Sequence, residues 1–119
     1  MLRVVAPWFV YLARCSDGTL YAGIARDVRA RIARHNAGKG ARYTRGRGPL
    51  RVLVTGRCAS KGDALRLELA IKRLARDQKL AIAASRRKLT TLAKACAVTL
   101  RTSRRANMRK ITKRLEAAG

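Results

Sequence analysis

Acidic residues are scarce in this sequence: six Asp and Glu stand against 29 Lys and Arg, for a formal net charge of +23. A folded chain with this much self-repulsion normally works beside a polyanion. Nucleic acid is therefore the first candidate partner, and an anionic membrane surface is the second. A ribosomal or chromatin-like packing role would produce the same composition, so the charge alone does not specify an activity.

Cysteines and long apolar runs are also in short supply. The three cysteines are far apart and none has CxxC spacing, which argues against a zinc site or a disulfide framework and favours reduced thiols in a cytosol. No run approaches the ~18 apolar residues of a membrane span. We therefore expect one domain in the cytoplasm, a monomer with no membrane partner and no small-molecule cofactor.

The most informative stretch runs from Trp8 to Asn36 and predicts a β-hairpin followed by a helix. An Asp-Gly pair between two apolar runs is a strong hairpin signal. Asp27 is a good N-cap residue, and Gly38 is a good C-terminal stop. The predicted parts are a strand at 9–12, a turn at 16–19, a returning strand at 20–24 and a helix from Asp27 to Gly38.

Two polar residues of this helix fall beside its apolar positions. Taking Val28 and Ile32 as the apolar markers, a rotation of ~100° per residue places Arg31 and His35 next to them, four residues apart on one face. Arg34 projects well away from that face. We therefore expect Arg31 to point inward beside the only histidine of the chain.

The segment 37–49 is a loop rich in Gly, Arg and Lys, with Tyr43 in its middle. Glycines allow the backbone to approach phosphates closely, and the cations supply an attractive field. Phosphate contact is favoured over a simple connector, because a tyrosine among cations suits contact with a base or sugar. The candidate nucleic-acid contacts in this loop are Lys39, Arg42, Tyr43 and Arg45.

The second half of the chain predicts a strand and several helices. The apolar run at 50–56 indicates a central strand covered on both faces. Ser60 or Asp63 then caps a helix through about Leu74, and a second helical piece covers about 77–85. Residues 79–119 carry 12 of the Lys and Arg residues and a single acid. The segment 86–119 therefore reads as a basic extension with one or two amphipathic helices, which dock on the domain at 1–85 or order on nucleic acid.

Several residues suit the hydrolysis of phosphodiester bonds, which needs a positioned water, a proton acceptor and stabilisation of charge on the phosphate oxygens. An arginine in a fixed place supplies charge, and a carboxylate can hold Mg²⁺. The chain has only two glutamates, so Glu68 on the 63–74 helix is the outstanding metal-ligand candidate. The alternative is a surface ion pair with Lys72 at i+4, which helix statistics alone would favour. Tyr11 and Tyr21, one on each arm of the hairpin, are either reactive hydroxyls or ordinary strand aromatics.

These residues carry a resemblance to the GIY-YIG nuclease domain, and in particular to its small stand-alone UPF0213 members. The resemblance covers roughly residues 7–85. It departs from the family at Phe9, which replaces the glycine of the first triplet, and at Ala22, which replaces Ile or Val in the second. The matching elements are Phe9-Val10-Tyr11, Tyr21-Ala22-Gly23, the helix 27–36, the loop 39–46 and the helix 64–74 with Glu68.

The resemblance implies an α+β fold, with a three-stranded antiparallel sheet flanked by helices. It also implies metal-dependent cleavage of nucleic-acid phosphodiester bonds with Mg²⁺ or Mn²⁺. Tyr11 would bind and activate the water or take its proton, while Tyr21 would support the site and the phosphate. Arg31 would stabilise the phosphate, and His35 would handle a proton. Glu68 would hold one divalent ion, and Gly23 would leave room beside the phosphate.

The favoured hypothesis is therefore a metal-dependent endonuclease acting on DNA, in repair or recombination of branched or damaged structures. The second is a non-catalytic basic protein that binds nucleic acid on a nuclease scaffold. A third and weaker one is an RNA-binding or ribosome-associated factor. Convergence of Tyr11, Tyr21, Arg31, His35 and Glu68 on one cleft is the structural expectation that separates the first hypothesis from the others.

Overall fold

The protein folds into a small sheet with helices on both sides. The computed structural model describes residues 7–38 and 49–101. The strands form one antiparallel sheet in the order β2-β1-β3, which confirms the predicted α+β class and three-stranded sheet. The elements, in chain order, are β1 (Trp8–Arg14), β2 (Leu20–Ala25), α1 (Val28–Asn36), β3 (Arg51–Cys58), α2 (Lys61–Lys72), α3 (Arg76–Ala84) and α4 (Arg86–Ala95).

The predicted hairpin and first helix form through local chemistry. The backbone NH of Thr19 donates to the Asp17 carboxylate at 2.9 Å, and Gly18 has a φ of +87°, which glycine adopts without steric cost. After β2, the Asp27 carboxylate accepts a hydrogen bond from the backbone NH of Ala30 at 3.0 Å. Asp27 is therefore the N-cap of α1, as the sequence predicts.

The third strand is the exception, because the prediction of a central position is wrong. β1 lies in the centre, and β3 lies at one edge of the sheet. A register shift between Leu12 and Ala13 accompanies its pairing with β1. Val52 packs against the apolar cluster beside α1, whereas Val54 packs against the cluster beneath the other helices. The apolar run of this strand thus reflects coverage of both faces without a strand on both sides.

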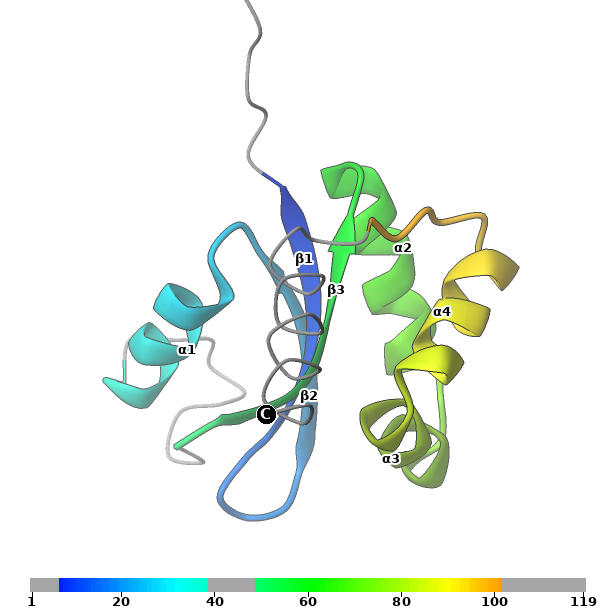
Figure 1. Ribbon diagram of the computed structural model, residues 1–119. Coiled ribbons are helices and arrows are strands. Elements are labelled where there is room, and N and C mark those ends of the chain that lie inside the picture. Colours follow the sequence, from blue (N-terminus) through cyan, green and yellow to red (C-terminus); the bar gives the residue numbers. More distant parts are fainter. Residues whose placement is uncertain (1–6, 39–48, 102–119) are drawn as a thin grey trace, which may run out of the picture.

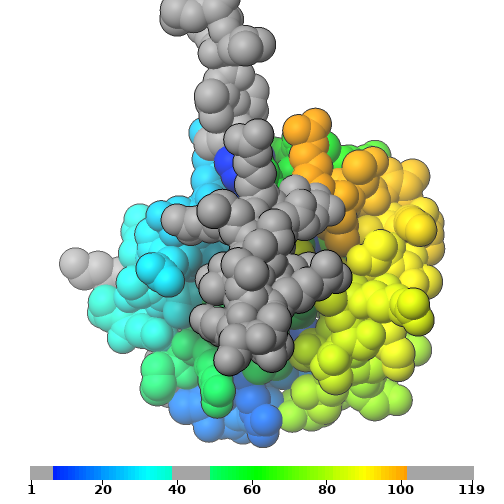
Figure 2. Space-filling view, viewed as in Figure 1, coloured from blue at the N-terminus to red at the C-terminus, as the bar shows by residue number. Residues whose placement is uncertain are grey.

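The helices divide between the two faces of the sheet (Figure 1). α1 covers one face, and α2, α3 and α4 cover the other. Figure 2 shows α1 and the α3–α4 pair as the two flanks of the same view. Within the described residues, every helix is too short or too polar to cross a bilayer.

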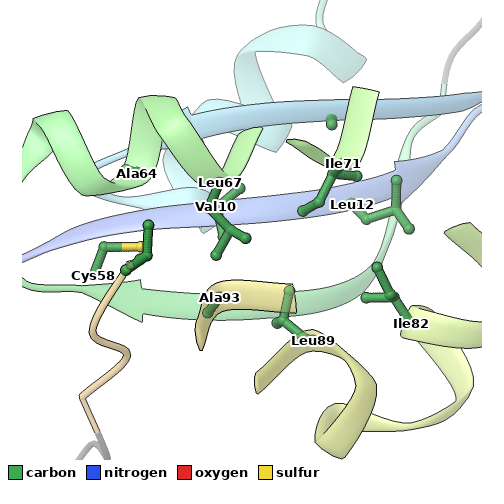
Figure 3. Packing of buried hydrophobic residues seen from close by; sticks show 11 residues of the cluster. Val10, Leu12, Cys58, Ala64, Leu67, Ile71, Ile82, Leu89 and Ala93 are labelled. Carbon is green, nitrogen blue, oxygen red and sulfur yellow. The ribbon is translucent and has the colours of Figure 1, made fainter. Parts of the chain in front are cut away.

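The larger of two apolar clusters lies between the sheet and the three helices (Figure 3). Val10 and Leu12 of β1 point into it, where they meet Leu67 and Ile71 of α2. α4 adds Leu89 and Ala93, which are 0% and 1% exposed. The packed core thus extends past the expected boundary at residue 85, because α4 is part of it.

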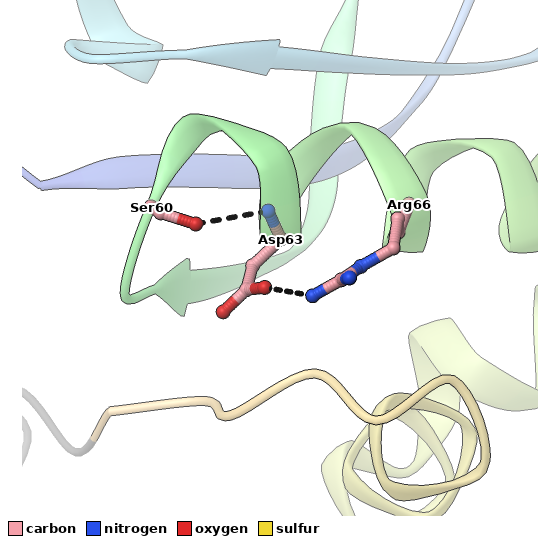
Figure 4. A network of polar contacts seen from close by, with 3 residues as sticks. All are labelled: Ser60, Asp63 and Arg66. Atoms are coloured by element: carbon pink, nitrogen blue, oxygen red, sulfur yellow. Dashed lines mark hydrogen bonds and ion pairs between the residues drawn. The ribbon is translucent and has the colours of Figure 1, made fainter.

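A hydrogen-bonded cap begins α2 (Figure 4). The Ser60 hydroxyl accepts a hydrogen bond from the backbone NH of Asp63 at 3.1 Å, and the Asp63 carboxylate pairs with Arg66. Of the two predicted caps, Ser60 is therefore the N-cap. This cap fixes where α2 begins and so the position of Glu68 two turns later.

The smaller cluster lies between the sheet and α1, on the opposite face. Its buried members are Tyr11, Ala13, Cys15, Ala25 and Leu50. Asn36, the last residue of α1, ties the chain back to this cluster. Its side-chain carbonyl accepts from the backbone NH of Leu50 at 2.6 Å, and its amide nitrogen donates to the Leu50 carbonyl at 3.5 Å.

Candidate active site

Tyr11 is the buried centre of the candidate site. It is 1% exposed and stands opposite Gly23 in the register of β1 and β2. A Cβ at position 23 would lie 2.6 Å from the Tyr11 hydroxyl oxygen and 2.7 Å from Cζ. Only glycine leaves room there, so the Tyr11 phenol lies across the backbone of its neighbouring strand. The resemblance implied that Gly23 leaves room beside the phosphate, and in the structure the Tyr11 ring fills the space next to Gly23.

Two more rings continue from Tyr11 toward α1. The Tyr21 ring centroid is 6.2 Å from that of Tyr11, with an interplanar angle of 48°. The His35 ring meets Tyr21 edge to face, with 5.6 Å between centroids. These distances are within the range of favourable aromatic pairs. The structure therefore brings three of the five predicted site residues into one row, from the sheet to the end of α1.

The protonation of this row is set by burial and neighbouring charge. Burial raises the pKa of Tyr11 well above its usual 10, and Tyr21 and the Glu68 carboxylate raise it further, while the Arg31 guanidinium opposes the shift. Burial also lowers the pKa of His35 below 6.5, with Arg31 and Arg34 acting in the same direction. At neutral pH the phenol is therefore protonated and the imidazole is uncharged.

Arg31 differs in part from its predicted placement. His35 is buried, with 5% of its surface exposed, but Arg31 is an exposed residue of α1. The two residues that the sequence placed on one inward face therefore differ in burial, and the inward orientation of the Arg31 guanidinium stays a prediction. Its charge nevertheless acts on the pKa values of both Tyr11 and His35. A long arginine side chain can place its charged head at the rim of a buried site while its stem lies along the surface.

Glu68 reaches the site from the other face of the sheet. α2 covers the face opposite α1, yet the Glu68 carboxylate contributes to the pKa of Tyr11. Its side chain is 18% exposed and pairs with Lys72 at 3.3 Å, which is the ion pair that the sequence offered as the alternative. The ion pair is therefore present, and the role of Glu68 as a metal ligand stays a prediction.

The edge of β2 is where the two faces meet. β2 is an outer strand, so its edge is open to the helices of both layers. A hollow of about 360 Å³ runs along it, where Lys72 and Lys79 stand beside Tyr21. The remaining lining residues are Leu20 and Ala22. Lys72, the ion-pair partner of Glu68, therefore stands beside Tyr21 at this edge.

Few of the described side chains at the candidate site could bind a metal ion. No group of three or more His, Cys, Asp or Glu side chains gathers in the parts of the chain that the structure describes. Glu68 is a partly buried carboxylate that already pairs with one cation. A single carboxylate suits Mg²⁺, which keeps several waters and takes further ligands from a substrate phosphate. The residues present therefore fit a one-carboxylate magnesium site.

Sequence reasoning missed two parts of this region. Asn36 fixes the start of β3, and Lys79 lines the hollow beside Tyr21. Asn36 follows the only histidine directly, but no local pattern announces a partner 14 residues away. The predicted loop contacts Lys39, Arg42, Tyr43 and Arg45 lie outside the described residues.

Comparison with known proteins adds an independent finding. The GIY-YIG catalytic domain matches residues 7–81. A UPF0213 protein of Nitratidesulfovibrio vulgaris is 50% identical over 78 residues, which are 66% of this chain and 71% of the relative. A UPF0213 protein of Halobacterium salinarum is 52% identical over 73 residues, 61% of this chain and 95% of the relative.

A solved relative is also similar in sequence. It is a UPF0213 protein from Bacillus halodurans, known from a solution NMR structure, and its sequence is 41% identical to this chain. The match covers 71% of this chain and 94% of the relative, with a TM-score of 0.44. The catalytic-domain match implies nuclease-type hydrolysis of phosphodiester bonds in nucleic acid, a chemistry that generally uses a divalent metal. The chain belongs to the GIY-YIG family and, within it, to the UPF0213 proteins.

Proposed function

We propose that this protein is a metal-dependent endonuclease that cleaves DNA in branched or damaged structures. The row formed by Tyr11, Tyr21 and His35, with the charges of Arg31 and Glu68 acting on it, is the observation that carries the proposal. These five residues come from four separate elements. A purely structural cluster does not require opposite charges from two layers of the fold to act on one buried phenol.

In this mechanism Tyr11 positions the attacking water. Its raised pKa keeps the phenol protonated, so it holds the water by hydrogen bonds and is a poor proton acceptor at neutral pH. The lowered pKa of His35 keeps its imidazole uncharged and ready to accept a proton. Tyr21 would relay the proton by giving its hydroxyl proton to His35 and taking one from the water. The resulting hydroxide attacks the phosphorus as the bond to the leaving sugar oxygen breaks.

The charged groups act on the phosphate and its counter-ion. The Arg31 guanidinium stabilises the negative charge that develops on the non-bridging oxygens. Glu68 would hold one Mg²⁺ or Mn²⁺ ion, which supplies a Lewis acid for the phosphate when bound. The ion would compete with Lys72 for the Glu68 carboxylate, and the displaced ammonium would remain next to Tyr21 in the hollow at the β2 edge.

Cleavage of labelled branched and linear DNA, with and without Mg²⁺, tests the proposal. We expect Arg31→Ala to slow cleavage by about 10²–10³, the usual cost of removing one group that stabilises transition-state charge. Glu68→Gln should abolish the response to Mg²⁺, because it removes the carboxylate and keeps its shape. Arg86→Ala and Asp77→Asn, exposed changes on α4 and α3, are charge-matched controls that should cleave normally. If wild type and Glu68→Gln are equally inert on every substrate, the protein is not this enzyme.

The second candidate is a non-catalytic protein that binds nucleic acid. The composition of the chain, with 29 Lys and Arg against six Asp and Glu, favours it. Its affinity would fall steeply with salt, by a log–log slope of about 0.9 for each phosphate contacted on duplex DNA. Arg31→Ala would barely change that affinity. A truncation after Arg101 would weaken it, and this end point leaves the α4 residues of the core in place.

A further inference from the structure

A cationic surface lies at the end of the sheet where α1 and α2 begin (Figure 1). β1 starts there, β2 and β3 end there, and α1 and α2 start there. In the strand register, Phe9 stands opposite Ala25 of β2 on one side and Arg57 of β3 on the other, and Trp8 stands opposite Cys58 of β3. Residues far apart in the sequence are therefore brought together at this end.

Basic residues from or next to β2, β3, α1 and α2 gather at this end. Arg26 follows β2, Arg29 lies in the first turn of α1, and Lys61 opens α2. The backbone NH of Arg101 donates to the Arg57 carbonyl at 2.8 Å, which adds the last described residue to the group. We call this surface the cationic end, and its residues are Arg26, Arg29, Arg57, Lys61 and Arg101.

Trp8 holds two of these cations in place. The Arg26 guanidinium carbon lies 5.0 Å from the Trp8 ring centroid, and the Lys61 ammonium lies 5.2 Å from it. Both distances are within the ~6 Å reach of a cation–π interaction. This contact restrains the side chains but leaves their N–H donors available, because the ring face accepts no ordinary hydrogen bond. Arg26 and Lys61 are therefore restrained cations, and no hydrogen bond from their side chains to another described residue is seen.

A hollow of about 460 Å³ opens beside them, lined by Phe9, Arg26, Asp27, Val28, Arg29 and Thr55. Thr55 is the strand partner of Tyr11, so the hollow adjoins the candidate site along the same strand pair. Asp27 is the acid in its wall, and its carboxylate already caps α1 through Ala30. The two arginines therefore determine the sign of the potential in the hollow.

Arg57 carries a buried hydrogen-bond donor for which the described residues supply no acceptor. Its Nε atom is buried and has no hydrogen-bond partner among the described residues. A buried guanidinium donor without an acceptor costs free energy, and the charge of this group adds to the positive potential of the cationic end. The N-terminal dipoles of α1 and α2 act in the same direction.

We propose that the cationic end binds backbone phosphates of the nucleic acid, next to the one held at Tyr11. The inference rests on the proposed function for the nature of the ligand. Phe9 lies two residues from Tyr11 along β1, or about 6.6 Å at 3.3 Å per residue. A strand held at Tyr11 thus passes over Phe9 and presents its neighbouring phosphate to Arg26 and Arg29.

The test measures the affinity of the full chain for a fluorescein-labelled DNA duplex across a salt series, in EDTA so that no strand is cut. We expect Arg26→Ala/Arg29→Ala to lower the log–log salt slope by about 2. At 0.1 M salt this change in slope corresponds to a variant that binds DNA on the order of 50-fold more weakly than wild type. Arg26→Lys/Arg29→Lys, which keeps both charges, should bind within a few-fold of wild type. Thermal melts confirm that each variant is folded.

The matched control is Arg86→Ala/Arg87→Ala, which removes the same charge from exposed positions at the start of α4, away from the cationic end. If this control loses as much slope and affinity as Arg26→Ala/Arg29→Ala, the effect is general charge and the cationic end is not a site. If the Arg26 and Arg29 variant loses the expected slope while wild type cuts no DNA, the nuclease proposal fails and the phosphate site stands.

Discussion

Gly23→Ala is the sharpest test of how the candidate site is built. The added methyl would lie 2.6 Å from the Tyr11 hydroxyl and 2.7 Å from Cζ, closer than side chains pack. Tyr11 is 1% exposed, so its ring has no open space to move into. Overpacking of this kind typically costs about 1–3 kcal/mol. Gly23 does not have a positive φ, so the cost is steric and not conformational.

Urea denaturation gives the assay, with cleavage rate measured in parallel. We expect Gly23→Ala to lower the free energy of unfolding by about 1–3 kcal/mol and to reduce cleavage, because Tyr11 must be displaced. In a Tyr11→Leu background the ring is gone, so the same Gly23→Ala change should cost far less. The coupling energy between the two positions then measures the contact itself.

Gly62→Ala is the matched control. Gly62 lies in α2, and a Cβ there meets only the Ser60 hydroxyl at an ordinary 3.8 Å, so alanine should be neutral or stabilise by up to about 1 kcal/mol. If Gly23→Ala is as harmless as Gly62→Ala, or costs the same with and without the Tyr11 ring, Tyr11 does not lie across Gly23 and this account of the site is refuted.

Three further predictions follow from contacts around the same site. Asn36→Ala should lower the free energy of unfolding by about 1–3 kcal/mol and speed hydrogen exchange at the Leu50 amide, because it removes that amide's acceptor. Tyr11 has a raised folded pKa, so its contribution to stability is present below pH 10 and is lost as pH rises above it. Tyr11→Phe should flatten that alkaline loss in a pH series of urea melts. His35 has a lowered folded pKa, so stability and cleavage should hold at neutral pH and fall only as pH drops below 6.5.

Each of these has an outcome that contradicts it. Unchanged exchange at Leu50 in Asn36→Ala would mean that another group holds the start of β3. An alkaline loss of equal size in Tyr11→Phe would assign it to other groups. Cleavage that rises as pH falls below 6.5 would show that His35 works as a charged acid, against the role proposed for it.

The sequence predicted best those features that depend on neighbouring residues. The turn at Gly18 and the cap at Asp27 follow from the preferences of single residues, and both formed as expected. The edge position of β3 was not predictable in this way. Its apolar run indicates only that both faces of the strand are covered. An edge strand between two side-chain clusters meets that condition as well as a central strand does.

The same limit applies to the candidate site. The helical wheel correctly placed His35 inward, but it could not show that Arg31 stays exposed. It also could not show that α1 and α2 cover opposite faces. For α4 the sequence left docking on the domain and ordering on nucleic acid as alternatives, and the burial of Leu89 and Ala93, at i and i+4, shows that α4 docks.

The division into two apolar clusters has a consequence for protein engineering. The candidate catalytic groups on β1, β2 and α1 border the smaller cluster, whereas the larger one holds most of the buried side chains. Thermostable variants are therefore best sought by redesigning positions such as Ile82, Leu89 and Ala93, which belong to the other cluster. A laboratory selection for robustness should accumulate changes on that layer and leave the face beneath α1 almost untouched.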